Sequence, residues 1–251
     1  MHTKDPIVDL AARIHDDARI TVITGAGVSA ASGVPTFRGA AGLWRNFTPE
    51  QLATPDAFRR DPKLVWEWYN WRREGIARCV PNAAHRVLAA WSRRYPQFKL
   101  ITQNVDGLHE KAGTVHVIRF HGSIWEVLCW QNCPASPARW WDESIPLASL
   151  PPRCPYCQGL LRPGVVWFGE GIDPEVLERS VEAAMCEVFL TVGTSAVVYP
   201  AAGLVLEAQK KGAFTVKINP EATPSSHVVD LVIQRPAEEA LPAIEALLQK
   251  S

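Results

Sequence analysis

The amino-acid sequence predicts an α/β protein built on an open, doubly wound parallel sheet. Short apolar runs rich in Val and Ile recur at residues 20–24, 98–103, 115–121, 187–193, 214–219 and 228–233. Several of these runs are nearly continuous rather than alternating, which is typical of strands buried on both faces of a parallel sheet. Helical patterns lie between most of the runs, and the alternation of strand and helix favours this architecture.

Start and stop signals mark the predicted helices near the C-terminus. Residues 173–186 begin with Asp173 and Pro174, a favourable pair at a helix N-terminus. Residues 199–212 end in two lysines and Gly212, which is a common way for a helix to stop. A final helix is predicted over residues 236–249.

Two stretches interrupt the alternation of strand and helix. Residues 40–84 hold a Trp-rich helical segment, and residues 123–165 are rich in Pro, Trp and Cys with little periodicity. We therefore expect a sheet domain made of residues 1–39, 85–122 and 166–251. A helical insertion would occupy residues 40–84, and a small cysteine-containing lobe would occupy residues 123–165.

The composition argues against two classes of partner. The 251 residues include 26 Lys and Arg and 26 Asp and Glu, so the formal net charge is zero. A general nucleic-acid binder more often carries a basic surplus, and no direct nucleic-acid binding is expected. The opening MHTKDPIVDL does not resemble a signal peptide, and no run approaches the roughly 20 apolar residues of a membrane span. We expect a cytoplasmic protein with no membrane segment.

Four of the six cysteines predict a structural zinc site. Cys129 and Cys133 form one short pair, and Cys154 and Cys157 form a second pair 20 residues later. Two such pairs at this separation are typical of zinc, and four thiolates would complete a closed tetrahedral site. The three-residue spacing in the first pair departs from the commoner spacing of two. Two disulfides or reduced core thiols are the alternatives, and Cys79 and Cys186 are expected in the core.

A glycine-rich loop follows the first predicted strand. Residues 25–30 read GAGVSA and match the pattern G-x-G-x-x-G/A. Glycines at these positions permit a tight turn and a close approach of the backbone to a pyrophosphate at a helix N-terminus. A dehydrogenase would also carry an acidic residue about 20 positions further on, at the end of a second strand. Here that region reads GLWRNFTPEQ and no strand precedes it, so the loop predicts a dinucleotide site that is not built for hydride transfer; a plain strand–turn–helix corner is the alternative.

Polar side chains follow four other predicted strands. Ligands of open α/β sheets gather at the carboxyl ends of the strands, so these side chains would converge on one crevice. They are Gln103, Asn104 and Asp106; His121; Gly193, Thr194 and Ser195; and Asn219 and Glu221. His121 is the candidate general base, because the pKa of an imidazole lies near 7. His85, His109 and His116 are expected to be structural.

Seven sequence features occur in a fixed order: GAGVSAASGVPTFRG, TQNVDGLH, FHGS, the four cysteines, RPGVVWFGE, VGTSAVVYPA and INPE. Together they resemble the sirtuins, which are NAD-dependent protein lysine deacylases, over about residues 18–240. The resemblance implies that NAD is consumed rather than reduced. The acyl oxygen of a modified lysine attacks the ribose carbon that bears nicotinamide, and the histidine matching His121 takes a proton from a ribose hydroxyl. The products would be free lysine, nicotinamide and O-acyl-ADP-ribose. The resemblance also implies that the partners are acyl-lysine proteins or peptides and that the zinc is structural.

The same resemblance implies which residues bind the cosubstrate and the peptide. Arg38 would meet a phosphate, and Phe37 would screen the reactive ribose carbon from water. Gln103, Asn104 and Asp106 would hold the nicotinamide ribose and amide, and the later strand ends would hold the adenosine half. The implied NAD-binding set is Gly25, Ala26, Gly27, Ser29, Thr36, Phe37, Arg38, Trp44, Gln103, Asn104, Asp106, Gly193, Thr194, Ser195, Asn219, Glu221 and Ala237. Val166 and Phe168, in the strand-like residues 165–169, would pair with an extended peptide.

Tyr69 and Arg72 point to the acyl group. On the helix predicted over residues 61–79 they share one stripe with Val65 and Ile76. The positions one turn from Arg72 hold no acidic residue, so we expect its charge to meet an anion from elsewhere.

The Tyr69-x-x-Arg72 pair resembles the class III sirtuin signature, which implies that Tyr and Arg bind the carboxylate of succinyl-, malonyl- or glutaryl-lysine. Ala40 and Ala41 would leave space for the acyl chain, and deacetylation is also expected. In the alternative interpretations, Arg72 pairs with Glu50 or Asp56, or reaches water.

Two other functions could use the same features. The crevice could transfer ADP-ribose to a protein side chain, or the chain could be a noncatalytic zinc-ribbon interaction module with a degenerate sheet domain. The intact set of Gln103, Asn104, Asp106 and His121 argues against the second of these.

Overall fold

The computed structural model describes residues 5–36, 48–195 and 197–250. The predicted roles of Phe37, Arg38, Ala40, Ala41 and Trp44 concern positions outside these described residues.

The centre of the molecule is a six-stranded sheet in which every described pair of neighbours is parallel. Its order is β3-β2-β1-β7-β8-β9. The strands are β1 (Ile20–Thr24), β2 (Lys99–Thr102), β3 (Val117–Arg119), β7 (Val188–Val192), β8 (Phe214–Ile218) and β9 (Leu231–Ile233). This arrangement confirms the predicted doubly wound sheet.

The register explains why the strands read as continuous apolar runs. Val22 of β1 is aligned with Leu100 of β2 and Leu190 of β7, and all three belong to one hydrophobic cluster. The next residue, Ile23, is aligned with Ile101 and belongs to a second cluster on the opposite face of the sheet. Successive side chains of a strand point to opposite faces, and helices cover both faces here, so neither face could be polar.

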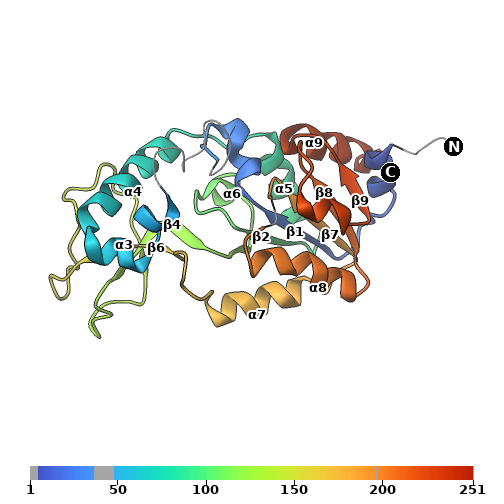
Figure 1. Ribbon diagram of the computed structural model, residues 1–251. Coiled ribbons are helices and arrows are strands. Elements are labelled where there is room, and N and C mark those ends of the chain that lie inside the picture. The colour runs from blue at the N-terminus through green and yellow to red at the C-terminus, as the bar shows by residue number, and fades with distance from the viewer. Residues whose placement is uncertain (1–4, 37–47, 196, 251) are drawn as a thin grey trace.

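Figure 1 shows helices on both sides of the sheet. Helices α1 (Pro6–Ala11), α5 (Ala83–Arg94) and α9 (Ala237–Leu248) supply residues to the cluster that contains Val22. Helices α7 (Pro174–Ala183) and α8 (Leu204–Lys210) supply the other cluster, together with the short 3-10 helix η3 (Ala201–Gly203). Helix α7 begins where the sequence predicts, since the Asp173 carboxylate accepts a hydrogen bond of 3.0 Å from the backbone N–H of Glu175.

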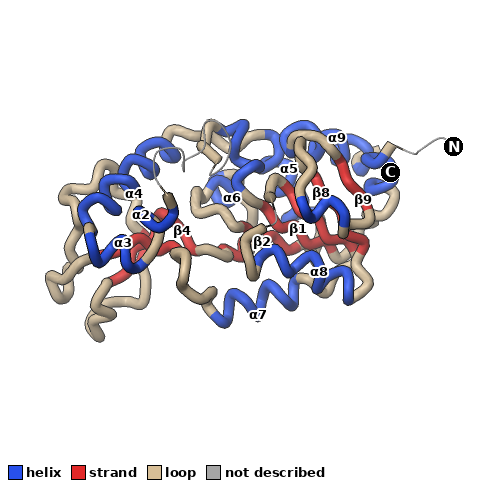
Figure 2. The backbone as a smooth tube through the Cα atoms, in the orientation of Figure 1, coloured by secondary structure: helices blue, strands red, loops and turns tan. Residues whose placement is uncertain are grey.

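A second lobe lies beside the sheet, at the left of Figure 2. It contains α2 (Pro49–Leu52), α3 (Pro55–Arg60), α4 (Pro62–Ala77) and an antiparallel sheet of order β5-β4-β6. The strands of this sheet are β4 (Gly122–Cys129), β5 (Trp140–Trp141) and β6 (Leu161–Val165). One hydrophobic cluster includes Phe58, Trp66, Val127 and Trp167. The helical insertion and the cysteine-containing segment therefore share one core.

This lobe differs from the sequence expectation in two places. Residues 123–165 hold most of β4 and β6, although little periodicity is visible there. Residues 165–169 are not a strand as a unit, because β6 ends at Val165 and a turn with Gly169 at φ +86° follows. The remaining short elements are the 3-10 helices η1 (Ala26–Ser32) and η4 (Pro224–His227) and helix α6 (Leu108–Lys111).

The chain order of the large sheet reverses between β1 and β7, since β2 and β3 lie on one side of β1 and β8 and β9 lie beyond β7. In open α/β sheets such a switch point is where ligands bind, at the carboxyl ends of the strands. The site is therefore expected beyond Thr24 and Val192. Within the described residues, no helix is both long and apolar enough to cross a membrane.

Candidate active site

The glycine loop packs directly against the end of β7. The backbone N–H of Gly25 donates to the carbonyl of Val192 at 3.1 Å, and that of Gly27 donates to the carbonyl of Gly193 at 2.7 Å. A Cβ atom on Gly27 would lie 2.7 Å from that same carbonyl oxygen, and Gly193 has a φ of +59°. The glycines are thus required for the close approach of two backbone segments, and the helix that they open, η1, is a 3-10 helix.

The polar residues after β2 bond to this loop. The Gln103 amide donates to the Thr194 hydroxyl at 3.1 Å, and the Asn104 amide donates to the Gly25 carbonyl at 3.1 Å. Ser29 donates to the Asp106 carboxylate at 2.8 Å. Burial raises the pKa of Asp106, while the bonds from the Leu108 N–H and the Ser29 hydroxyl oppose that rise. The structure therefore brings the residues after β1, β2 and β7 into one connected group.

A layer of buried polar side chains lies behind this group. The rings of His85 and His109 are 4.8 Å apart. His109 Nε2 lies 3.0 Å from the Thr24 hydroxyl, and His85 Nδ1 lies 3.1 Å from Asn82 Oδ1. Burial lowers the pKa of each histidine to about 3, so both rings are neutral at physiological pH. Both histidines are hydrogen-bonded to neighbouring side chains of the protein, as expected for structural residues.

His121 follows β3 and is held in one tautomer. Its Nδ1 lies 3.0 Å from the carbonyl oxygen of Gln103. A carbonyl oxygen can only accept, so Nδ1 carries the proton of the neutral ring and Nε2 has its lone pair available. Burial lowers the pKa of His121, and the bond to Gln103 partly offsets that effect. The ring is therefore neutral near pH 7 and able to take a proton.

The residues expected to hold the adenosine half follow β7 and β8. Gly193 donates its N–H to the Ile218 carbonyl at 2.9 Å, which ties the end of β7 to the end of β8. The Asn219 amide donates to the Glu221 carbonyl at 2.7 Å. Ser195 follows Thr194 in the same loop, and Ala237 begins α9, where it is buried in the core. Ala26 begins η1, and Thr36 is the last residue described before the gap.

The segment after β6 lies against His121. The backbone N–H of Val166 donates to the His121 carbonyl at 3.0 Å, and that of Phe168 donates to the Ala53 carbonyl at 2.9 Å. The N–H of Trp167 donates to the Glu170 carboxylate at 2.8 Å. All three N–H groups are used within the protein, so an added peptide strand would have to pair with carbonyl groups of this segment.

Tyr69 and Arg72 lie on the buried face of α4. Tyr69 is 2% exposed and Arg72 is 8% exposed. The guanidinium carbon of Arg72 lies 4.7 Å from the centre of a Trp68 ring. Burial lowers the pKa of Arg72, and attraction to Tyr69 and Asp106 opposes that shift. Asp56 is ion-paired with Arg59, and Glu50 is exposed, so the structure does not favour either carboxylate as the partner of Arg72.

Three residues of this region were not singled out from the sequence: Trp167, Arg162 and Glu170. The Trp167 indole N–H donates to the Tyr69 hydroxyl at 3.0 Å. Arg162 and Glu170 form an ion pair that flanks Trp167. Two opposite charges that bracket an apolar turn in RPGVVWFGE are the signal that could have indicated this pair.

The four clustered cysteines satisfy the geometry of one zinc site. Their sulfur atoms all lie within 4.8 Å of one another. Cys129 and Cys157 are 3.6 Å apart, and Cys133 and Cys154 are 3.8 Å apart. A tetrahedron with Zn–S bonds of about 2.3 Å has sulfur–sulfur edges of about 3.8 Å. The donor set therefore fits a structural zinc, and the spacing of three in the first pair is no obstacle to it.

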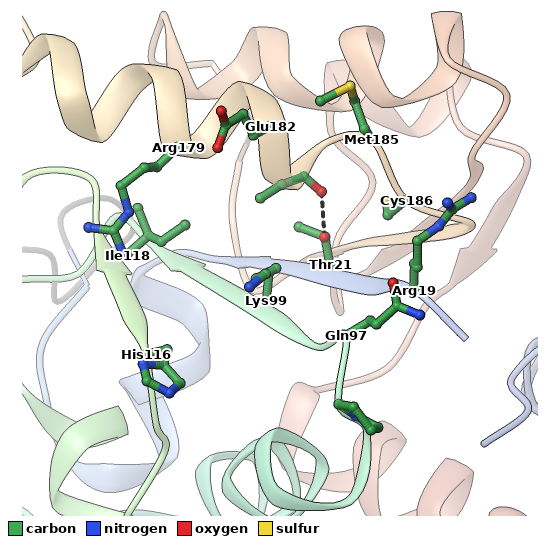
Figure 3. A pocket seen from close by; sticks show the side chains of 12 residues that line it. Arg19, Thr21, Gln97, Lys99, His116, Ile118, Arg179, Glu182, Met185 and Cys186 are labelled. Atoms are coloured by element: carbon green, nitrogen blue, oxygen red, sulfur yellow. Dashed lines mark hydrogen bonds between the residues drawn. The ribbon is translucent and has the colours of Figure 1, made fainter. Parts of the chain in front are cut away.

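A cavity of about 400 Å³ lies at the opposite ends of the strands, and Figure 3 shows the side chains that line it. It lies by the amino ends of β1, β2 and β3, under helix α7, and its lining includes Arg19, Lys99, His116, Arg179 and Glu182. None of the sequence-predicted site residues lines it. This cavity is therefore separate from the polar group at the carboxyl ends of the strands.

Known proteins are similar to this chain in sequence and in fold. The model of the Sir2 family matches residues 25–200. The NAD-dependent protein deacylase of Aquifex aeolicus is 48% identical over 94% of this chain and 97% of its own length. NAD-dependent protein deacylase 1 of Pseudomonas aeruginosa is 46% identical, covering 90% of this chain and 92% of its own.

Solved structures of Sir2 proteins are also similar to this chain. A Sir2 homologue in complex with NAD superimposes with a TM-score of 0.88 at 41% identity, covering 99% of this chain and 95% of that one. A Sir2–p53 peptide–NAD⁺ complex gives a TM-score of 0.83 at 27% identity, covering 99% of this chain and all of that one. These matches extend over nearly the whole chain, and the chain belongs to the Sir2 family.

Proposed function

We propose that this NAD-dependent protein deacylase of the sirtuin family removes acyl groups that end in a carboxylate, namely succinyl, malonyl or glutaryl groups, from lysine side chains. Acetyl groups would be removed as well. The products are free lysine, nicotinamide and O-acyl-ADP-ribose. The observation that carries the acyl preference is the buried pair of Tyr69 and Arg72 on one face of α4.

His121 serves as the general base in this proposal. NAD supplies the electrophilic ribose carbon and the ribose hydroxyl. The Gln103 carbonyl holds the Nδ1 proton, which leaves Nε2 to accept the proton of that hydroxyl. Asn104 and Asp106 would orient the nicotinamide end, since both are fixed by bonds to Ser29 or the glycine loop.

The acyl chain would reach α4 along the segment after β6. Val166 is bonded to the His121 carbonyl, and its neighbour Trp167 is bonded to Tyr69. A lysine held beside Val166 would therefore lie near both His121 and the contact between Trp167 and Tyr69. A guanidinium offers two parallel N–H donors to a carboxylate, and its attraction to that anion is strengthened where water is excluded.

A panel of peptides of one sequence, carrying acetyl-, malonyl-, succinyl- or glutaryl-lysine, tests the preference with NAD in excess. In Arg72→Met, kcat/KM for the acidic acyl groups is expected to fall by about 10- to 100-fold, because a charge-assisted contact worth about 1.5–3 kcal/mol is lost. The acetyl peptide should lose less than about threefold. Lys63→Met, which removes an exposed charge from the same helix, is the matched control. Equal losses on all four peptides would exclude Arg72 from acyl recognition.

Product analysis separates this function from ADP-ribosyl transfer to protein. Mass spectrometry should find O-acyl-ADP-ribose in amounts equal to the deacylated peptide. ADP-ribose attached to protein, with no such small product, would replace the deacylase assignment.

A further inference from the structure

We propose that the Arg162–Glu170 ion pair, acting through Trp167, is a positioning device that aims the Tyr69 hydroxyl proton at the carboxylate of the acyl group. This inference rests on the proposed function of Tyr69 and Arg72. It adds three residues that touch neither the cosubstrate nor the acyl group in our assignment. They would set acyl selectivity by fixing the direction of one hydrogen bond.

The ion pair is bidentate and closes the turn after β6. Arg162 Nη1 lies 2.5 Å from Glu170 Oε1, and Nη2 lies 2.8 Å from Oε2. Nη2 also donates to the Val165 carbonyl at 2.9 Å. Burial would raise the pKa of Glu170, but the bonds from Arg162 and from the Trp167 N–H hold it below its usual value. Glu170 is therefore charged at neutral pH and the pair is formed.

Trp167 is held by both members of the pair. Its backbone N–H donates to Glu170 at 2.8 Å, and the Arg162 guanidinium carbon lies 3.7 Å from the centre of its ring. A cation stacked on an indole is a favourable and directional contact. Trp167 is also 2% exposed, so neither its backbone nor its ring is free to turn.

The fixed indole in turn sets the Tyr69 hydroxyl. Its N–H donates to the Tyr69 oxygen at 3.0 Å and so occupies an acceptor position of that oxygen. The phenolic hydrogen must then point elsewhere in the ring plane. In the part of the chain that the structure describes, no acceptor for it is found. Burial raises the pKa of Tyr69, so the hydroxyl keeps its proton. The arrangement leaves a donor in place for an incoming carboxylate.

The consequence is specific to acyl groups that carry an anion. An acetyl group has no carboxylate, so the direction of the Tyr69 proton makes no difference to it. A succinyl or malonyl group gains a hydrogen bond only if the proton is already directed. Loss of the Trp167 N–H should therefore weaken binding of acidic acyl peptides and leave the acetyl peptide nearly unchanged.

Trp167→Phe tests this, because it removes the N–H donor, together with part of the ring volume, and keeps an aromatic ring beside Arg162. KM for the succinyl peptide is expected to rise about fivefold, the typical value of one hydrogen bond, with kcat within about twofold. The acetyl peptide should change by less than twofold in both constants. Trp71→Phe, which makes the same change at an exposed position of α4, should affect neither peptide.

A double-mutant cycle with Tyr69→Phe separates positioning from loop damage. If Trp167 acts through the Tyr69 hydroxyl, Trp167→Phe should change the succinyl-to-acetyl ratio by less than about twofold in the Tyr69→Phe background. A ratio change that persists there, or an equal loss on both peptides, overturns the inference. Should Trp167→Phe fail to fold, Glu170→Gln in the same two backgrounds gives the same test.

The two proposals fail in different ways. If Arg72→Met and Tyr69→Phe leave the succinyl-to-acetyl ratio unchanged, the acyl pocket itself is wrong. If both change that ratio while Trp167→Phe and Glu170→Gln do not, the pocket stands and only the positioning device is wrong.

Discussion

A single carbonyl oxygen decides the chemistry available to His121. Gln103 follows β2 and turns its backbone carbonyl toward Nδ1, so the tautomer is set by the main chain rather than by a side chain. Replacing His121 by Ala should lower kcat by about 10²- to 10⁴-fold, the usual contribution of a general base. Binding of NAD, measured by calorimetry, should change little. Turnover within tenfold of wild type would show that another group is the base.

The same environment predicts the pH dependence. A base must be neutral to act, so activity is present above the pKa of His121 and is lost as the pH falls through it. Burial lowers that pKa from the ordinary imidazole value near 6.5. The acid limb of kcat/KM, measured between pH 5 and 8, should therefore have its midpoint below 6.5. A midpoint at or above 6.5 would contradict the desolvated position of the ring.

At the scale of single elements, the strands of the large sheet could be predicted and those of the second lobe could not. A parallel strand is buried on both faces, so its composition alone reveals it, as for β1 and β7. Strand β4 is antiparallel and mostly buried, so it does not show a regular alternation of apolar and polar residues, and it begins with Gly122 and ends with Cys129. The polar residues at the strand ends could be predicted as well, because each of them directly follows an apolar run of the large sheet. Trp167, by contrast, depends on the ion pair of Arg162 and Glu170, and its sequence signal is limited to two opposite charges that bracket the turn.

The pairing of β4 with β6 connects the predicted zinc site to the core of the second lobe, so removal of zinc should affect that core. Cys129 ends β4, and Trp130 beside it lies with its ring 5.0 Å from that of Phe58 and 6.3 Å from that of Trp167. Stripping the metal with a thiol reagent and a chelator should release about one zinc per chain and change the tryptophan fluorescence of this cluster. Acyl-peptide turnover should fall with it, because the shared core supports both β6 and α4.

Cys157→Ser should reduce the zinc content, whereas Cys79→Ser, at a buried cysteine outside the cluster, should not. A fully active protein without zinc would show that the four thiols are only core residues.

At the scale of the whole molecule, the polar layer behind the site couples acidity to folding. Thr24 of β1, His109 of α6 and His85 of α5 join three elements in the interior. Both histidines are held neutral, with pKa values of about 3, whereas an unfolded chain protonates them near 6.5. The unfolded state therefore binds two more protons between these values, and stability must fall as the pH is lowered from 6.5.

The slope is the measurable quantity. Two protons correspond to a loss of about 2.7 kcal/mol in the free energy of unfolding per pH unit, on top of whatever the carboxylates contribute. His109→Gln removes one titrating group. The difference in the free energy of unfolding between this variant and wild type should therefore change by about 1.4 kcal/mol per pH unit. Urea unfolding at several pH values from 4.5 to 7 measures both slopes. If His109→Gln ran parallel to wild type, His109 would be protonated within the fold, and it could not be part of a neutral layer behind Ser29, whose hydroxyl lies 3.4 Å from His85 Nε2.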